Sequence, residues 1–395
     1  MSTAEPDSVV VVGAGMIGSA AARHLRAAGC DVTVVGRPEP EVYETHDGPW
    51  ASHWDQARVT RVIDPHPLKA LAALRTIERL PALEQASGET LHHPIGLVYS
   101  SPSVEQAAQH SIDLGQHIDW LDADECRTRH GITLDGRDPI AWEGAPAGHI
   151  DPLAMVRAEL AVGRADGVRL VEGRAIGLTR SGSQWSVETT AGVFEADAVL
   201  LATGPHGASF AGVELAITRA LRTRLMLEFE APMSVPSLIV DDVGHPDVTG
   251  IYWTPPVRYP DGRVMLKIGA DERQTRFADG DADLDAWFRA GGHPDEARHL
   301  REVIDVLLPG VPVRSTFHQP CVTTWTDNGV PYIGPIDDGL VVAVGGNGGA
   351  AKSCDEWGRL AAEVIRTGST NDPDFTDEAL TPRLGDSAPR EKGRY

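Results

Sequence analysis

A glycine-spaced turn between an apolar run and an alanine-rich run most constrains how this chain can fold. Val9–Val12 is a β-branched run of the kind that is buried on both faces of a parallel sheet. It leads into Gly13-Ala14-Gly15-Met16-Ile17-Gly18, a helical pattern over 19–28, a stop at Gly29 and a second strand over 32–35. This order predicts a βαβ unit whose glycines bring the helix N-terminus close to the phosphates of a dinucleotide.

The end of the second predicted strand leaves the identity of the dinucleotide open. An acidic residue that binds the adenosine ribose is expected there, but Gly36-Arg37 occupies the position. An arginine at this point is compatible with a 2′-phosphate and therefore with NADP. The sequence up to this point fits FAD or NADP.

Two later segments favour FAD. The apolar strand over 198–201 closes in Ala-Thr-Gly, with Thr203 and Gly204 leaving room for a dinucleotide beside the first unit. The strand over 340–344 is followed by a cluster of small residues that includes Gly346 and Gly348, and then by a helix. A second helix N-terminus placed in this way would face a group with partial negative charge, such as the pyrimidine edge of a reduced flavin.

Length and charge exclude several classes of function. At 395 residues the chain exceeds the size of one hydrophobic core, so two domains are expected. A formal net charge of −22 argues against nucleic acid or an anionic membrane as partner, and indicates a small molecule in a local pocket. No apolar run approaches the roughly 20 residues of a membrane-spanning helix, and the N-terminus does not resemble a signal peptide.

The four cysteines predict a reducing compartment. Cys30, Cys126, Cys321 and Cys354 are too few and too irregularly spaced for a disulfide framework, and no CxxC pair indicates zinc. We therefore expect no metal site and a cytoplasmic location. Each cysteine, considered alone, is most simply a small buried hydrophobic residue.

Four patches carry a resemblance to a known family. They are the GAGMIG turn, the segment SHWDQARVTR over 52–61, Leu266-Lys267-Ile268-Gly269, and PCVTTWT over 320–326. From about residue 8 to 365 the chain resembles the monomeric sarcosine oxidase and N-methyltryptophan oxidase family, within the D-amino-acid-oxidase-like flavoproteins. The resemblance implies oxidation of an amine by FAD, with oxygen as acceptor and hydrogen peroxide as product.

The resemblance also implies roles for individual residues. Cys321 falls where the family joins FAD through a thioether to the flavin 8-methyl group, and Arg58 falls where an arginine lies close to the flavin ring. Arg61 and Lys352 occupy the family's carboxylate-binding positions, although the glycine loop before Lys352 is one residue shorter here. Lys267 corresponds to a lysine above the flavin that stabilises charge developing on oxygen.

Two positions depart from the members that oxidise sarcosine. Asp271 stands where a histidine is found, and Trp253 where a tyrosine is found. Both positions belong to the substrate pocket of the family, so the substrate is expected to differ from sarcosine. A carboxylate can hold a cationic or N–H-bearing substrate, and a tryptophan wall suits a flat or cyclic one. The alternative for Trp253 is ordinary core packing.

The sequence thus predicts an α/β protein with a Rossmann-like FAD domain and an inserted α+β catalytic domain with a mixed sheet. The FAD domain would comprise 7–93, 151–217 and 325–370, the catalytic domain 94–150 and 218–324, and the tail 371–395 would be loosely ordered. The expected catalytic residues are Lys267, Arg61, Lys352, Asp271 and Trp253, and the expected cofactor-binding residues are Gly13, Gly15, Ile17, Gly18, Arg37, Ser52, Arg58, Thr203, Gly204, Cys321, Gly346, Gly348 and Lys352.

The expected reaction is oxidation of the C–N bond of an amino acid to an imine. The candidate substrates are an N-methyl amino acid, a cyclic imino acid of the proline or pipecolate type, and a primary amino acid, with a secondary amine favoured. The expected partners are this small acid and molecular oxygen, and we expect a monomer. An NADP-dependent dehydrogenase and a non-catalytic flavin-binding scaffold remain as alternatives.

Overall fold

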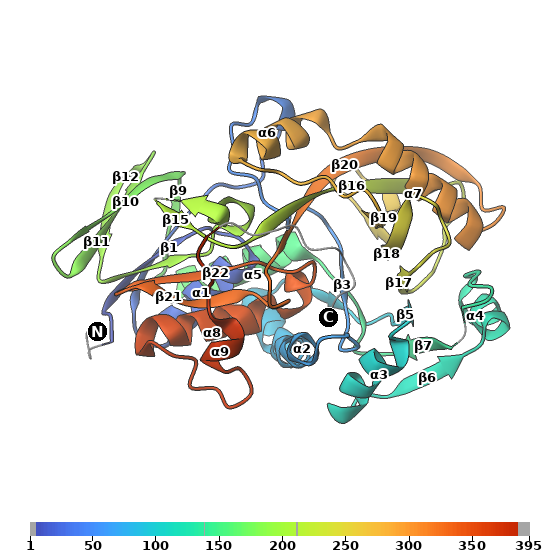
Figure 1. Ribbon diagram of the computed structural model, residues 1–395, viewed down its shortest axis with the longest axis horizontal. Helices are drawn as coiled ribbons and strands as arrows, with labels where there is room; N and C mark the ends of the chain where they lie inside the picture. Colours follow the sequence, from blue (N-terminus) through green and yellow to red (C-terminus); the bar gives the residue numbers. More distant parts are fainter. Residues whose placement is uncertain (1–4, 138, 211, 386–395) are drawn as a thin grey trace.

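The computed structural model describes residues 5–137, 139–210 and 212–385, and two large sheets organise them (Figure 1). The first sheet has six strands in the order β21-β22-β13-β1-β2-β9. All neighbours pair in parallel except β21, which is antiparallel to β22 at one edge. The strands are β1 Ser8–Val12, β2 Asp31–Gly36, β9 Arg169–Glu172, β13 Ala198–Leu201, β21 Tyr332–Asp337 and β22 Leu340–Val344.

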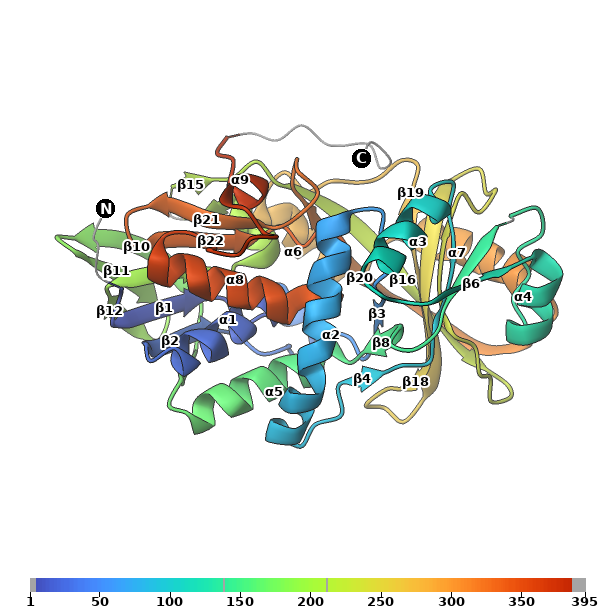
Figure 2. The ribbon, with the colours of Figure 1, turned by 90° about the horizontal axis from the view of Figure 1, so that it is seen from below.

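Both faces of the six-stranded sheet are covered, which explains the uninterrupted apolar runs of its strands. Val9 and Val11 face a core that helices close, whereas Val10 and Val12 face a core shared with a smaller antiparallel sheet. Figure 2 shows the helical layer. The helices are α1 Met16–Ala27, α2 Pro67–Ser87, α5 Pro152–Ala165 and α8 Cys354–Thr367, and the smaller sheet is β10 Ala175–Ser181, β11 Gln184–Thr189 and β12 Gly192–Ala196.

The second large sheet has eight strands in the order β20-β16-β19-β18-β17-β5-β7-β6. It is mixed, because β17 and β5 pair in parallel while the other neighbours are antiparallel. Its strands are β5 Leu97–Ser100, β6 Ile118–Leu121, β7 Ile140–Glu143, β16 Thr218–Phe229, β17 Ser237–Asp241, β18 Val248–Arg258, β19 Val264–Glu272 and β20 Val313–Trp325.

Shorter elements join and flank the two sheets. One small sheet, β3-β8-β4, consists of Arg58–Thr60, Gly148–Ile150 and His92–His93, and a two-stranded pair consists of β14 Ser209–Phe210 and β15 Val213–Glu214. The remaining helices are α3 Val104–Asp113, α4 Ala123–His130, α6 Asp281–Ala290, α7 Pro294–Leu307 and α9 Asp377–Leu380, with 3-10 turns η1 Tyr43–Thr45, η2 Gly204–Ala208 and η3 Ala350–Ser353.

The segments proposed from the sequence contribute to the two sheets in different ways. Segments 7–93, 151–217 and 325–370 supply every strand of the six-stranded sheet, and 94–150 and 218–324 supply those of the eight-stranded sheet, β20 ending at Trp325. The two predicted strands and the predicted helix of the βαβ unit are confirmed. None of the helices within the described ranges has the length and apolar character needed to span a bilayer.

Three helices and part of the tail differ from the expectation. No helix was assigned from the sequence at the positions of α3 and α4 in segment 94–150 or of α7 in segment 218–324. The tail was expected to be loosely ordered, but Phe375 and Leu380 are buried in the core beneath α8. Backbone hydrogen bonds to Glu214 and Ala216 hold Gly385 and Arg383, and the remainder of the tail lies outside the described residues.

Candidate active site

A cavity of about 880 Å³ lies where the two large sheets meet. The carboxyl ends of β1, β2, β13 and β22 open into it from one side, and residues of β16, β18, β19 and β20 line it from the other. Ligands of open α/β sheets bind at this end of the strands. The volume is in the range of cofactor and substrate pockets, and the position is the one expected for a dinucleotide.

Glycines close the turn at the first end of the cavity. Gly13 has a φ of +114°, and a Cβ there would lie 2.3 Å from the carbonyl oxygen of Ala202. A Cβ on Gly18 would lie 1.9 Å from the carbonyl oxygen of Gly13, so α1 can approach β1 only with glycine here. Gly15 precedes the first turn of α1, which has neither an acidic side chain nor a side-chain cap. Its N–H groups are therefore suited to bind phosphate.

The other predicted cofactor residues of this end divide into two groups. The residues that line the cavity are Gly13, Gly15, Ile17, Arg37, Ser52, Thr203 and Gly204. Gly18 lies outside this wall and lets α1 pack closely against the turn. Arg37 donates to the carbonyl oxygen of Gly48 and pairs with Asp47, beyond the end of β2.

The second glycine cluster reaches the cavity through a 3-10 turn. Gly346 and Gly348 line the cavity, and η3 lies between them and the start of α8. Thr324 on β20 fixes the cluster, because its hydroxyl accepts from the Gly346 N–H (3.1 Å) and its carbonyl from the Asn347 N–H (2.8 Å). The helix N-terminus expected directly after the glycines is thus replaced by one 3-10 turn.

One cross-strand row of the eight-stranded sheet leads from Cys321 across the cavity wall. Cys321 lies opposite Arg222, and Gly250 lies between Asp241 and Asp271 in the registers of their strands. An ion pair of 3.0 Å between Arg222 and Asp271 joins the two parts of the row. All five residues except Gly250 line the cavity. Asp271 is therefore at the cavity, as expected, but its carboxylate is bound by an arginine.

A second group of charges lies behind Cys321, around the buried carboxylate of Asp55. That carboxylate accepts from Lys267 (2.6 Å), Arg224 (2.9 Å), Tyr259 (3.0 Å) and Arg58. Burial raises the pKa of the Cys321 thiol, but the positive charges of Arg224, Arg58 and Lys267 outweigh this and lower it below its usual value. A thiol held in this way has a larger thiolate fraction and is a better nucleophile.

Lys267 is fully buried, which excludes a position on the solvent face of its strand. It faces the same side of β19 as Gly269 and Asp271, because side chains alternate along a strand. Its ammonium donates to Asp55 and to the carbonyl oxygen of Ala57, and it does not line the cavity. The role proposed for Lys267 at the flavin stays a prediction.

A third charged group, the anion pole, lies at the end of the cavity near α2, and we define it as Arg61, Asp64, Lys69 and Lys352. Asp64 accepts from Arg61 Nη2 and Lys352 Nζ, both at 3.1 Å, and Lys69 Nζ lies 3.8 Å away. Burial raises the pKa of Asp64, but these three cations lower it far below its usual value. Arg61, Asp64 and Lys69 line the cavity, whereas Lys352 does not.

On β18 the cavity is lined by Tyr252 and not by Trp253. Trp253 is fully buried in the core under α7, where its indole N–H donates to the carbonyl oxygen of Pro236 (2.8 Å). Tyr252 lines the cavity, and its ring lies across Gly269, where a Cβ would meet the ring at 2.6 Å. The expectation for Trp253 is therefore wrong. Because the pleat turns neighbouring residues to opposite faces, a one-residue offset moved the assignment from the cavity to the core.

Sequence reasoning missed several residues of this site, among them two carboxylates and two cations. Asp55 and Asp64 are the two buried carboxylates that hold the cations, and Arg224 and Lys69 are two of those cations. A signal existed for Asp55, which stands inside the arginine-containing segment over 52–61. Arg224 offered one too, since a charge within the apolar run of β16 is costly to bury without a partner.

Comparison with known proteins decides the family. A family model described as "FAD dependent oxidoreductase" matches residues 8–364. The chain belongs to this family. Among solved structures, NikD, titled an unusual amino acid oxidase, has a TM-score of 0.79 at 21% identity and covers 97% of this chain and 98% of its own. L-proline dehydrogenase from P. horikoshii has a TM-score of 0.72 at 17% identity, covering 94% and 96%.

A curated relative of this FAD-dependent oxidoreductase has a larger chain. It is the tRNA 5-methylaminomethyl-2-thiouridine biosynthesis bifunctional protein MnmC of Burkholderia multivorans, 25% identical over 343 residues. The match covers 83% of this chain and 48% of MnmC, so the chain spans about half the length of that relative. The structural likeness to NikD and proline dehydrogenase shows the shared fold.

The residues of the cavity fit FAD. The hydroxyl of Thr203 is buried without a hydrogen-bond partner among the described residues, and Thr203 lines the cavity beside the first glycine turn. The space above Gly15 is open, since the nearest atom to a Cβ there belongs to His53 at 3.8 Å. These features leave room for a dinucleotide at α1 and place a polar group to contact it.

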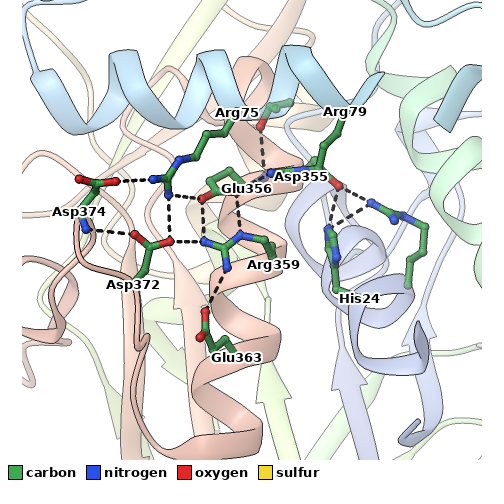
Figure 3. A network of polar contacts seen from close by, with 11 residues as sticks. His24, Arg75, Arg79, Asp355, Glu356, Arg359, Glu363, Asp372 and Asp374 are labelled. Carbon is green, nitrogen blue, oxygen red and sulfur yellow. Dashed lines mark hydrogen bonds and ion pairs between the residues drawn. The ribbon is translucent and has the colours of Figure 1, made fainter. Parts of the chain in front are cut away.

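A partly buried ion network joins α2 and α8, the two helices next to the anion pole. Lys69 lies in the first turn of α2, and Lys352 lies in η3, which leads into α8. Between the two helices Glu356 is fully buried and accepts from three arginines. Figure 3 shows the network, whose labelled members are His24, Arg75, Arg79, Asp355, Glu356, Arg359, Glu363, Asp372 and Asp374. Separating the two helices would leave the buried charge of Glu356 without a partner, which is costly. The network therefore stabilises their packing.

Proposed function

We propose that this FAD-dependent oxidoreductase oxidises the C–N bond of an amino acid, with a secondary amine as the favoured substrate. The observation that carries the proposal is the presence of Arg61 and Cys321 in the walls of one cavity. A guanidinium donates charge-assisted hydrogen bonds to a carboxylate, and a thiol of lowered pKa suits attachment of a flavin. A substrate carboxylate at Arg61 would hold the adjacent C–N bond within the same cavity as the flavin.

The chain's own residues would bind and orient the substrate. Arg61 lies 6.0 Å from the centre of the Tyr99 ring, and both line the cavity with Tyr252. The aromatic side chains give an apolar wall next to the carboxylate site and exclude water from it. FAD, when bound, supplies the acceptor for two electrons and returns them to oxygen, so that the products are an imine and hydrogen peroxide.

The substrate class follows from what lines this wall. Trp253 lies in the core and gives no reason to favour a flat or cyclic substrate. The rings of Tyr99 and Tyr252 line the cavity and do favour one. Asp271 is neutralised in part by Arg222 and so holds a substrate N–H group better than it holds a full positive charge. A cyclic imino acid of the proline or pipecolate type and an N-methyl amino acid both fit this description. Structural neighbours named amino acid oxidase and L-proline dehydrogenase support it.

Other functions have less support. The family depends on FAD, which removes the reason for an NADP-dependent dehydrogenase. A non-catalytic scaffold would have no use for buried cations on two sides of the cavity. MnmC is named for tRNA modification, but a net charge of −22 does not favour a polynucleotide substrate here.

A panel assay for peroxide tests the proposal. The panel contains L-proline, L-pipecolate, sarcosine and glycine, with pyrrolidine and piperidine as analogues that lack the carboxylate. We expect peroxide from a secondary amino acid, at a kcat/KM at least about tenfold above that of its analogue. Absence of peroxide with every acid, or equal rates for acid and analogue, would contradict the proposal.

A further inference from the structure

Lys352 has no N–H group left for a substrate. Its ammonium has three hydrogens, and three acceptors surround it: Asp64 Oδ2 at 3.1 Å and the carbonyl oxygens of Arg61 and Lys69, each at 3.3 Å. Its side chain is 1% exposed, and it is absent from the walls of the cavity although its neighbours Ala350 and Ala351 line it. A substrate carboxylate could reach Lys352 only by breaking this buried set of contacts.

Asp64 separates Lys352 from the cavity. Its Oδ2 accepts from Lys352 and from Arg61, and its Oδ1 accepts from the N–H of His66 (2.9 Å). Both oxygens are therefore engaged on the protein side, and the carboxylate is 1% exposed. Asp64 thus occupies the place beside Lys352 that a substrate carboxylate would need.

Arg61 keeps one nitrogen for a ligand. Its Nε donates to the carbonyl oxygen of Ile63 (2.8 Å), and its Nη2 donates to Asp64. Within the described ranges Nη1 has no protein acceptor, and Arg61 lines the cavity. Asp64 and the Ile63 carbonyl therefore orient the guanidinium with one edge directed away from them.

Lys69 is the second cation of the anion pole that lines the cavity. Its side chain is 12% exposed, and its Nζ is 3.8 Å from Asp64 Oδ1. The anion pole has three cations and one carboxylate, so one carboxylate from a ligand leaves it with a net positive charge. The two cations that can meet that ligand at the cavity wall are Arg61 and Lys69.

We propose that the substrate carboxylate is bound by Arg61 and Lys69, and that Asp64 and Lys352 are positioning residues behind them. This inference rests on the proposed function, because it assumes that the substrate is an acid. It replaces the assignment of Lys352 as a substrate ligand. It also makes Lys69 a specificity-determining residue, since acids would depend on it and uncharged analogues would not.

Ligand binding to the FAD-loaded enzyme tests the inference. Cyclopentanecarboxylate and cyclopentanecarboxamide have the same ring and nearly the same shape, and only the first is an anion. Each is titrated into the holoenzyme, and binding is followed by the visible spectrum of the flavin and by calorimetry. We expect Lys69→Gln to weaken the carboxylate about tenfold or more and to leave the carboxamide within about twofold.

Two further variants make the result specific. Lys69→Arg keeps the charge and should restore most of the preference for the carboxylate. Lys352→Met should reduce that preference less than Lys69→Gln does, because Lys352 acts only through Asp64. A Lys69→Gln enzyme that keeps the preference would overturn the inference alone, and so would a Lys352→Met enzyme that loses more of it than Lys69→Gln does. An unmodified enzyme that binds both ligands equally would overturn the inference and the proposed function together.

Discussion

The carboxylate of Asp55 lies 2.6 Å from the ammonium of Lys267, and neither side chain is exposed to solvent. Burial and the charges of Arg58 and Arg224 lower the pKa of Lys267 well below its usual value. The contact with Asp55 opposes that effect, because an adjacent negative charge favours the charged form of an amine. Asp55 therefore favours the charged form of Lys267, while burial and the two arginines keep its pKa below the usual value.

Lys267→Met should slow the reaction of the reduced enzyme with oxygen far more than its reduction by substrate. Loss of one preorganised charge near a developing anion costs about 10²-fold or more. Stopped-flow absorbance measures the two half-reactions separately. Thr254→Val is a matched control, because Thr254 lies opposite Lys267 and its buried hydroxyl has no partner among the described residues. Equal slowing of both half-reactions by Lys267→Met would contradict the assigned role.

Cys321→Ala should release the flavin from the denatured protein. If Cys321 carries FAD, acid precipitation of the unmodified enzyme gives a yellow pellet, whereas the variant gives a colourless pellet and a yellow supernatant. Cys126→Ala is the control. That thiol is buried in the core between the eight-stranded sheet and α7, and burial raises its pKa to about 11. A colourless pellet from the unmodified enzyme would exclude attachment through Cys321.

Tyr252 and Trp253 should give opposite results when changed to phenylalanine. Trp253→Phe removes volume and a buried hydrogen bond, so it should lower the free energy of unfolding by about 1–3 kcal/mol and leave kcat/KM nearly unchanged. Tyr252→Phe should lower kcat/KM several-fold and leave stability within about 1 kcal/mol, since Tyr252 lines the cavity and phenylalanine keeps its ring. Urea denaturation and steady-state kinetics measure both. The reverse pattern would restore Trp253 to the pocket.

Binding of carboxylates should weaken as the pH rises through about 8. Burial lowers the pKa of Lys352 to about 8, although Asp64 beside it acts in the opposite direction. When Lys352 loses its proton, only Arg61 and Lys69 balance the negative charge of Asp64. These two cations then attract a ligand anion less strongly. The carboxyl group of Glu143 also interacts with the charge of Lys352, and burial raises the pKa of that carboxyl group. The measurement is the dissociation constant of cyclopentanecarboxylate between pH 6.5 and 9.5.

The same titration does not unfold the protein. The unfolded chain keeps a lysine pKa near 10.5, so between about pH 8 and 10.5 it binds more protons at this residue than the folded chain does. The contribution of Lys352 to stability therefore rises with pH over this range.

Lys352→Met should abolish the change in carboxylate affinity with pH. An unchanged pH dependence in that variant would assign the titration to another group.

The sequence was sufficient for the elements whose signal is local. The strand, glycine turn and helix from Ser8 to Ala27 form as expected, because the glycines at 13 and 18 allow approaches that no side chain permits. Helix α4 was missed because Cys126 is its only buried side chain, and a capping box between Asp122 and Glu125 begins it instead. Helix α7 carried a usable pattern of buried residues at helical spacing, which the polar residues between them obscured.

The site was predicted less completely, since it depends on contacts between distant segments. Arg61, Arg58 and Cys321 reach the cavity as the resemblance implied. The carboxylates that hold the cations could not be assigned, because Asp55 meets Lys267 across 212 positions of sequence. The error at Trp253 has a different origin, since a register shift of one residue exchanges the two faces of a strand.

Anaerobic mixing of the FAD-loaded enzyme with its best amino acid from the panel tests the central claim most directly. The account predicts that the visible absorbance of the flavin is lost without oxygen, and that air restores it with about one equivalent of peroxide per flavin. A flavin that stays oxidised with every amino acid of the panel would contradict the account.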